Sequence, residues 1–135
     1  MNICIDCEWN GFGGELISMA LVAENGLEFY EVLGCDNPHP WVAENVMPIL
    51  NKEPISLEFF QKRLESFLFQ FDSVNVIADW PEDIEKFCAS LIVGAGERIS
   101  TPPLSMQIIR VDAESALPHN ALEDARGIMK LIKST

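Results

Sequence analysis

Two acids stand one residue apart near the start of the chain, in the stretch CIDCEW at residues 4–9. Residues 2–8 alternate in side-chain character, which predicts a β-strand that places Asp6 and Glu8 on the same face. One interpretation is a strand face open to water. The other is chemistry, because neighbouring carboxylates repel each other unless a cation neutralises them. Oxygen ligands without thiolates or paired histidines favour Mg²⁺ or Mn²⁺ over zinc.

A second pair of acids follows the apolar stretch VNVIA at residues 74–78. Asp79 stands at the end of this expected strand, and Asp83 falls in the first turn of a helix expected from Pro81 to about residue 92. Each acid alone has a structural explanation. Aspartate often caps a helix, and an acid in the first turn interacts favourably with the helix dipole.

A third acid lies near the end of the chain, on a helix expected at residues 121–132. The apolar stripe of this helix includes the position of Asp124, so the carboxylate faces the protein body, where an unpaired charge is costly. Asn120 and Glu123 have the spacing of a capping box, which places His119 and Asp124 where many helices have an apolar staple. An imidazole and a carboxylate in those places indicate chemistry, although His119 alone is also explained as a loop histidine.

The acids are remote along the chain, yet the expected elements can bring them to one crevice. Carboxylates within a few ångströms of each other require cations. Two divalent ions about 3.5 to 4 Å apart would neutralise the charge and stabilise both the attacking and the leaving oxygen in phosphoryl transfer. We therefore expect that the acids of the first strand are tolerated because they share a metal.

The sequence also predicts the order of the strands and helices that must position these residues. Strands are expected at residues 2–8, 16–22, 27–33, 74–78 and 104–111, and helices at residues 41–47, 56–71, 81–92 and 121–132, with a long loop at residues 94–103. Asn25-Gly26 predicts a tight hairpin turn between the second and third strands. Three antiparallel strands followed by alternating helices and strands predict an α/β domain whose mixed sheet is covered by helices.

Length and composition fit one domain over residues 1–135, since 48% of the residues are hydrophobic. No apolar run approaches the roughly 18 residues of a membrane span, so we expect a soluble, cytoplasmic protein without a membrane partner. The four cysteines lack the spacing of a secreted scaffold and are expected to be reduced.

The net charge of −12 results from 21 acids against 9 Lys and Arg. Broad electrostatic binding of a nucleic acid duplex requires a basic surface, which this composition does not provide. Any contact with a nucleic acid is therefore expected to be local.

Three segments resemble the motifs of the DEDDh 3′-to-5′ exonucleases, a family that includes proofreading exonuclease domains, RNase T and oligoribonuclease. DCEWNG at residues 6–11 is similar to the first motif, D-x-E-x-x-G. VIADWPEDIEKF at residues 76–87 resembles the second motif, and HNALEDAR at residues 119–126 resembles the third, H-x-x-x-x-D. The segments occur in the family's order and span most of the chain.

This resemblance implies a ribonuclease H-like fold, with a mixed five-stranded sheet and helices on both faces. It also implies two bound Mg²⁺ or Mn²⁺ ions and 3′-to-5′ hydrolysis of single-stranded nucleic acid to nucleoside 5′-monophosphates. RNA is favoured because the chain is most similar to the compact exoribonuclease branch. By the motifs, the metal ligands are Asp6, Glu8, Asp83 and Asp124, and His119 is the general base. The family usually has Asn where this chain has Asp79, so Asp79 is an alternative or additional ligand.

Expected contacts with the 3′ end of single-stranded RNA or DNA come from the residues that follow the first acids: Trp9, Asn10, Gly11 and Phe12. Trp9 or Phe12 would stack on a base, with ordinary packing as the alternative for Phe12. Phe59 and Phe69 on the long helix suit either a homodimer contact or packing against a neighbouring helix. Two other functions fit the same sequence: a catalytically silent binding or scaffold module, and a phosphodiesterase for small nucleotides.

Overall fold

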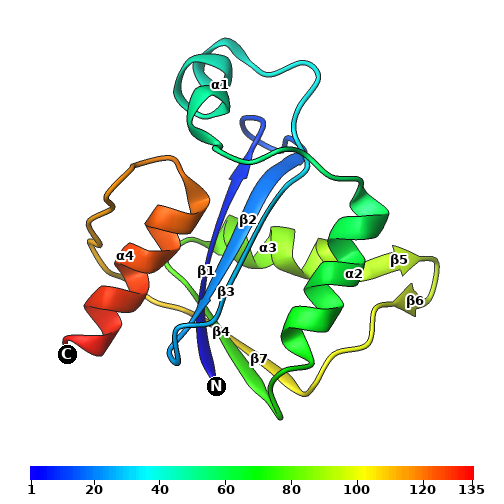
Figure 1. Ribbon diagram of the computed structural model, residues 1–135, viewed down its shortest axis with the longest axis vertical. Helices are drawn as coiled ribbons and strands as arrows, with labels where there is room; N and C mark the ends of the chain where they lie inside the picture. Colours follow the sequence, from blue (N-terminus) through cyan, green and yellow to red (C-terminus); the bar gives the residue numbers. More distant parts are fainter.

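The computed structural model describes residues 1–135, and a five-stranded mixed sheet forms its centre (Figure 1). Its strands are β1 (Asn2–Trp9), β2 (Leu16–Ala23), β3 (Glu28–Val32), β4 (Val74–Ala78) and β7 (Leu104–Ile108), in the order β3-β2-β1-β4-β7. β1, β2 and β3 are successively antiparallel, whereas β4 is parallel to both β1 and β7. The prediction of an α/β fold with a mixed sheet is confirmed.

The first three strands form because their alternation and turn chemistry agree. Gly26 has a φ of 93°, and the Ala23 amide donates a hydrogen bond to the Leu27 carbonyl at 2.9 Å, which confirms the predicted turn. β2 is buried along nearly its whole length, as expected for a strand that is covered on both faces.

One face of the sheet is covered by α2 (Leu57–Leu68) and α3 (Pro81–Ser90). Ser56 caps α2, since its side chain accepts a hydrogen bond from the Phe59 amide at 3.1 Å. Phe60 and Leu64 are completely buried, and the ring of Phe60 meets that of Phe29 edge to face at 5.5 Å. Leu57, at the start of the helix, is exposed.

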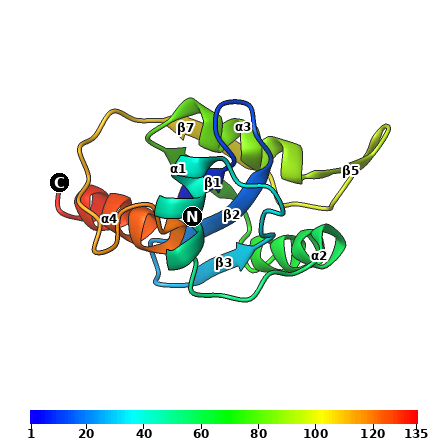
Figure 2. The same ribbon diagram turned by 90° about the horizontal axis from the view of Figure 1, so that it is seen from above.

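The opposite face is covered by α4 (Ala121–Lys133), as Figure 2 shows from above. Ala121 and Ala125 of the helix pack against Ala20 of β2, and these small side chains let the helix approach the sheet closely. The segment before α4 also packs tightly, since a Cβ at Gly127 would lie 2.1 Å from the carbonyl oxygen of Glu114.

Smaller elements close the ends of the sheet. α1 (Pro40–Asn45) and the 3-10 turn Met47–Ile49 cover the ends of β2 and β3. The predicted loop at residues 94–103 is partly wrong, because β5 (Ile92–Gly94) and β6 (Glu97–Arg98) form a small hairpin beside the main sheet (Figure 1). None of the helices combines the length and apolar character needed to cross a membrane.

Candidate metal centre

Asp6 and Glu8 share the face of β1 that α4 covers. Their paired residues on the neighbouring strand β2 are Ala20 and Ser18, whose small side chains leave room for two carboxylates. The solvated strand face is the wrong interpretation for Asp6, because its Oδ2 atom is buried and has no hydrogen-bond partner. Ser18 Oγ, directly opposite Glu8, is also buried and unpaired.

Asp79 and Asp83 come from the adjacent end of β4 and the first turn of α3. β1 and β4 are parallel, so their carboxyl ends meet at one edge of the sheet, where ligands of α/β proteins commonly bind. Asp83 is 1% exposed, and its Oδ1 accepts a hydrogen bond from the Cys7 amide at 3.0 Å. The helix-cap explanation for Asp79 is wrong, because Trp80 occupies the cap position of α3 and no side chain caps the helix.

Asp124 reaches the same region from the start of α4. Asn120 caps this helix by accepting a hydrogen bond from the Glu123 amide at 3.0 Å, and its amide group donates to the Ile49 carbonyl at 2.9 Å. The backbone amide of His119 donates a hydrogen bond to Asp124 Oδ2 at 3.2 Å, which fixes the direction in which the chain enters α4. His119 and Asp124 therefore do contact each other, through a hydrogen bond from the His119 backbone amide to the Asp124 carboxylate.

The His119 ring is exposed and belongs to neither group of acids. It meets the ring of Trp41 on α1 edge to face at 5.0 Å, and the residue has a positive φ of 73°. A non-glycine residue in this conformation stores strain, which is common at functional sites. The structure thus places the His119 backbone next to Asp124, with the exposed ring against Trp41.

The carboxylates form two groups that share one member. In one group, ligand atoms of Asp6, Glu8 and Asp124 all lie within 4.8 Å of one another, and in the other the same holds for Asp6, Asp79 and Asp83. Asp79 and Asp83 belong to the same group, so either residue or both could be the metal ligand from this segment. Each group offers the hard oxygen donors of a divalent cation site, so these acids can hold a metal ion.

The electrostatics of the crevice also call for cations. Burial raises the pKa of all five carboxyl groups, to about 8 for Glu8 and about 7 for Asp83, and their mutual repulsion raises most of them further. The pKa of Asp6 is raised by burial first and then by the charges of Asp83 and Glu8. No Lys or Arg forms an ion pair with any of the five. A buried acid with an unpaired oxygen fits a metal ligand better than a structural role.

No thiol belongs to either group of ligand atoms. Cys4 and Cys7 point to opposite faces of β1 and belong to separate apolar cores, and all four cysteines are free. Burial raises the pKa of the Cys4 thiol to about 12, which disfavours the thiolate that soft metals prefer. The donor set of the crevice is therefore oxygen only.

The four residues proposed to contact substrate have different surroundings. Asn10 is 6% exposed, and its amide group is engaged with Glu15, Asn37 and the His39 amide, so its side chain holds the turn together. Trp9 packs partly against the core, whereas the Phe12 side chain is fully exposed. The ordinary-packing alternative for Phe12 is therefore wrong.

Sequence reasoning did not find two exposed aromatic side chains and one buried hydroxyl. Trp41 touches His119, and Trp80 directly follows Asp79; both rings are more than half exposed. The position of Trp80 beside an acid was a usable signal, but nothing local distinguishes Trp41. The hydroxyl of Ser18 could only be found by pairing β2 with β1 in the correct register.

Neither a family model nor a curated protein matches the chain. The site is thus defined by its own residues, five acids at the carboxyl ends of β1 and β4 that can hold a divalent cation in either of two groups sharing Asp6. We call these five acids the acidic crevice: Asp6, Glu8, Asp79, Asp83 and Asp124.

Proposed function

We propose that the protein is a metal-dependent 3′-to-5′ exonuclease that hydrolyses single-stranded nucleic acid, preferably RNA, to nucleoside 5′-monophosphates. The observation that carries this proposal is the sharing of Asp6 between two groups of carboxylates. One carboxylate between two groups is suited to holding two ions side by side. The mixed five-stranded sheet is compatible with the ribonuclease H-like fold that we propose with this function.

Asp6, Glu8 and Asp124 would hold one ion, and Asp6, Asp83 and Asp79 the other. Mg²⁺ or Mn²⁺, when bound, would neutralise the carboxylates and stabilise the negative charge that develops on the attacking and leaving oxygens. This assignment makes Asp79 an additional ligand. It also explains why a buried Asp6 oxygen has no partner within the protein.

The remaining residues would position the substrate and move a proton. The His119 imidazole is exposed, and the backbone of this residue is bonded to Asp124, so the imidazole would take the proton of the attacking water. The water oxygen would bond to phosphorus as the P–O3′ bond breaks, and the leaving 3′ oxygen would take a proton from solvent in exchange for the one removed by His119. Phe12 would stack on a base, since its ring is fully exposed next to the acidic strand end.

The direct test is incubation of 5′-labelled single-stranded RNA and DNA with the purified protein and Mg²⁺ or Mn²⁺. The expected result is a ladder of products that shorten from the 3′ end, with nucleoside 5′-monophosphates released and RNA degraded faster than DNA. EDTA should stop the reaction. Intact oligomers in both metals would contradict the proposal, and cleavage of dinucleotides alone would indicate a small-nucleotide phosphodiesterase.

A further inference from the structure

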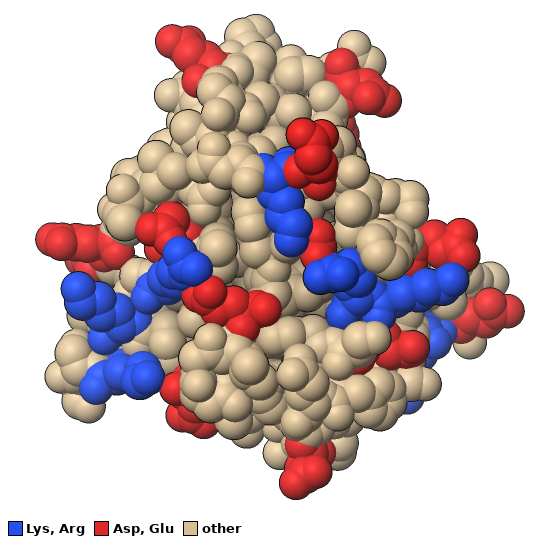
Figure 3. All heavy atoms as spheres, viewed as in Figure 1, with Lys and Arg blue, Asp and Glu red and all other residues tan.

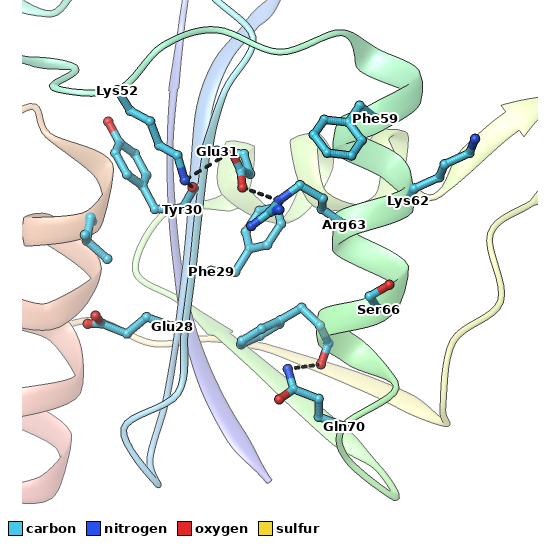
Figure 4. A pocket seen from close by; sticks show the side chains of 12 residues that line it. Glu28, Phe29, Tyr30, Glu31, Lys52, Phe59, Lys62, Arg63, Ser66 and Gln70 are labelled. Atoms are coloured by element: carbon cyan, nitrogen blue, oxygen red, sulfur yellow. Dashed lines mark hydrogen bonds and ion pairs between the residues drawn. The ribbon is translucent and has the colours of Figure 1, made fainter.

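A groove of about 700 Å³ follows the free edge of β3, between α2 and α4 (Figure 4). β3 is the last strand of the sheet on this side, so no other strand lies beside residues 28–31. The groove is separate from the acidic crevice, because none of the five carboxylates lines it.

The charge of the groove differs from that of the chain. Lys52, Lys62 and Arg63 line it, against two acids, Glu28 and Glu31. Three more cations lie on α4: Arg126 pairs with Glu28 at 2.6 Å, and it lines a neighbouring hollow together with Lys130 and Lys133. Six of the nine Lys and Arg residues therefore border this region, and Figure 3 shows blue side chains gathered over α2 and α4.

The cations at the upper end of the groove are held in place by a buried carboxylate. Glu31 is 2% exposed, and it forms ion pairs with Lys52 at 3.2 Å and with Nε of Arg63. The terminal nitrogens of Arg63 make no hydrogen bond within the chain, and the guanidinium lies over the half-exposed ring of Phe59. Figure 4 shows Arg63 reaching from α2 toward β3. The groove thus offers oriented, unused donors beside an aromatic ring.

We propose that this groove binds the sugar-phosphate backbone of a single-stranded polynucleotide whose 3′ end occupies the acidic crevice. The inference rests on the proposed function and extends it to the part of the substrate remote from the reaction. Arg63 contacts phosphates inside the groove, and the Phe59 ring stacks on a base. Lys62, on the outer side of α2, and Lys130, in the neighbouring hollow on α4, contact phosphates where the polynucleotide passes the two ends of the groove.

An acidic peptide that adds a strand to β3 fits the groove less well. The Tyr30 carbonyl, which points away from β2, already accepts a hydrogen bond from the Lys52 ammonium at 2.6 Å. The Val32 carbonyl accepts a hydrogen bond from the Ile55 amide at 2.8 Å, as part of an isolated β-bridge between Val32 and Pro54. Both contacts block the edge to strand addition. Phosphates and bases do not require these backbone groups.

α4 connects the two sites. Asp124 lies on its inner side, in the acidic crevice, and Arg126 lies two residues later on its outer side, bonded to Glu28 in the groove. In the proposed complex, the polynucleotide passes around the outer side of α4 to reach the groove. Long oligomers therefore gain affinity from the groove, and dinucleotides do not.

The test measures binding without metal, by fluorescence anisotropy in EDTA over a range of salt concentrations. The probe is a labelled single-stranded RNA about 12 nucleotides long, within the usual range of such sites. Lys62→Gln and Lys130→Gln each should lower affinity about two- to threefold at moderate salt and reduce the salt slope by roughly 0.7.

Lys62 is suitable because it is exposed and pairs only with Glu58. Arg98→Gln on the β5–β6 hairpin, with the same loss of charge, should bind as the wild type does.

Unchanged affinity in Lys62→Gln and Lys130→Gln would overturn the groove proposal. Equal binding of polyglutamate, with no effect of Phe59→Leu on RNA affinity, would overturn it in favour of an acidic protein partner. The two proposals fail separately: hydrolysis that is insensitive to the groove variants contradicts only the groove. RNA binding that the variants weaken, without any hydrolysis by the wild type, supports the groove and contradicts the exonuclease.

Discussion

Without divalent cations, the protein is expected to lose stability as the pH rises from 5 to 8, and Mn²⁺ is expected to restore it. The carboxyl of Glu8 has a pKa of about 8 in the folded protein and an ordinary value of 4.5. Between these values the folded state binds more protons than the unfolded chain, so the free energy of unfolding falls with rising pH. The contribution is fully present below pH 4.5 and is lost as the pH passes through 8.

The size of this effect is measurable by thermal unfolding. One pKa unit corresponds to about 1.4 kcal/mol, so the shift of the Glu8 pKa from 4.5 to about 8 corresponds to about 5 kcal/mol, or roughly 15 °C in Tm. At pH 8, Mn²⁺ at a hundredfold excess over its Kd should return about 2.7 kcal/mol. Glu8→Gln should reduce the pH dependence, whereas Glu58→Gln, which removes an exposed acid on α2, should leave it unchanged. A Tm in EDTA that rises toward pH 8 would contradict this account.

Replacing Asp6 by Asn is expected to raise stability and abolish activity in the same variant. Asn keeps the shape of the side chain but removes a buried charge that faces other acids. The metal-free Tm at pH 8 should therefore increase. Hydrolysis should fall at least about a thousandfold, because the loss of a ligand common to both groups removes several kcal/mol of charge stabilisation.

These opposite changes separate a lost metal site from a damaged fold. The matched control is Asp72→Asn, an exposed acid outside the crevice, which should alter neither Tm nor hydrolysis. If Asp6→Asn lowered the metal-free Tm, Asp6 would stabilise the fold. Retained hydrolysis would show that the chemistry occurs elsewhere.

Local patterns predicted most of the fold because the relevant signals lie within single elements. β4 was predicted with its observed limits because VNVIA is a short apolar run between polar residues. The last strand was predicted to reach residue 111 but ends at Ile108, where its partner β4 also ends, at Ala78. Strand length here is set by the neighbour, which the sequence of the strand itself does not encode.

The acids of the crevice were predictable, and most of their surroundings were not. Asp124 was found because a carboxylate interrupts an apolar helix face, and Asp6 because of strand periodicity. Asn10 was expected to contact substrate, but three hydrogen bonds to residues up to 29 positions away hold its side chain within the protein. Trp41 reaches His119 across 78 positions, by a contact that only the tertiary fold creates.

The central claim is that Asp6 binds two metal ions at once. A crystal structure of the protein soaked in Mn²⁺, with anomalous diffraction recorded near the manganese edge, tests it most directly. We expect two peaks about 3.5 to 4 Å apart, one beside Glu8 and Asp124 and the other beside Asp79 and Asp83, with Asp6 in contact with both. No peak in the crevice, or a single peak without Asp6 as a ligand, would contradict the account.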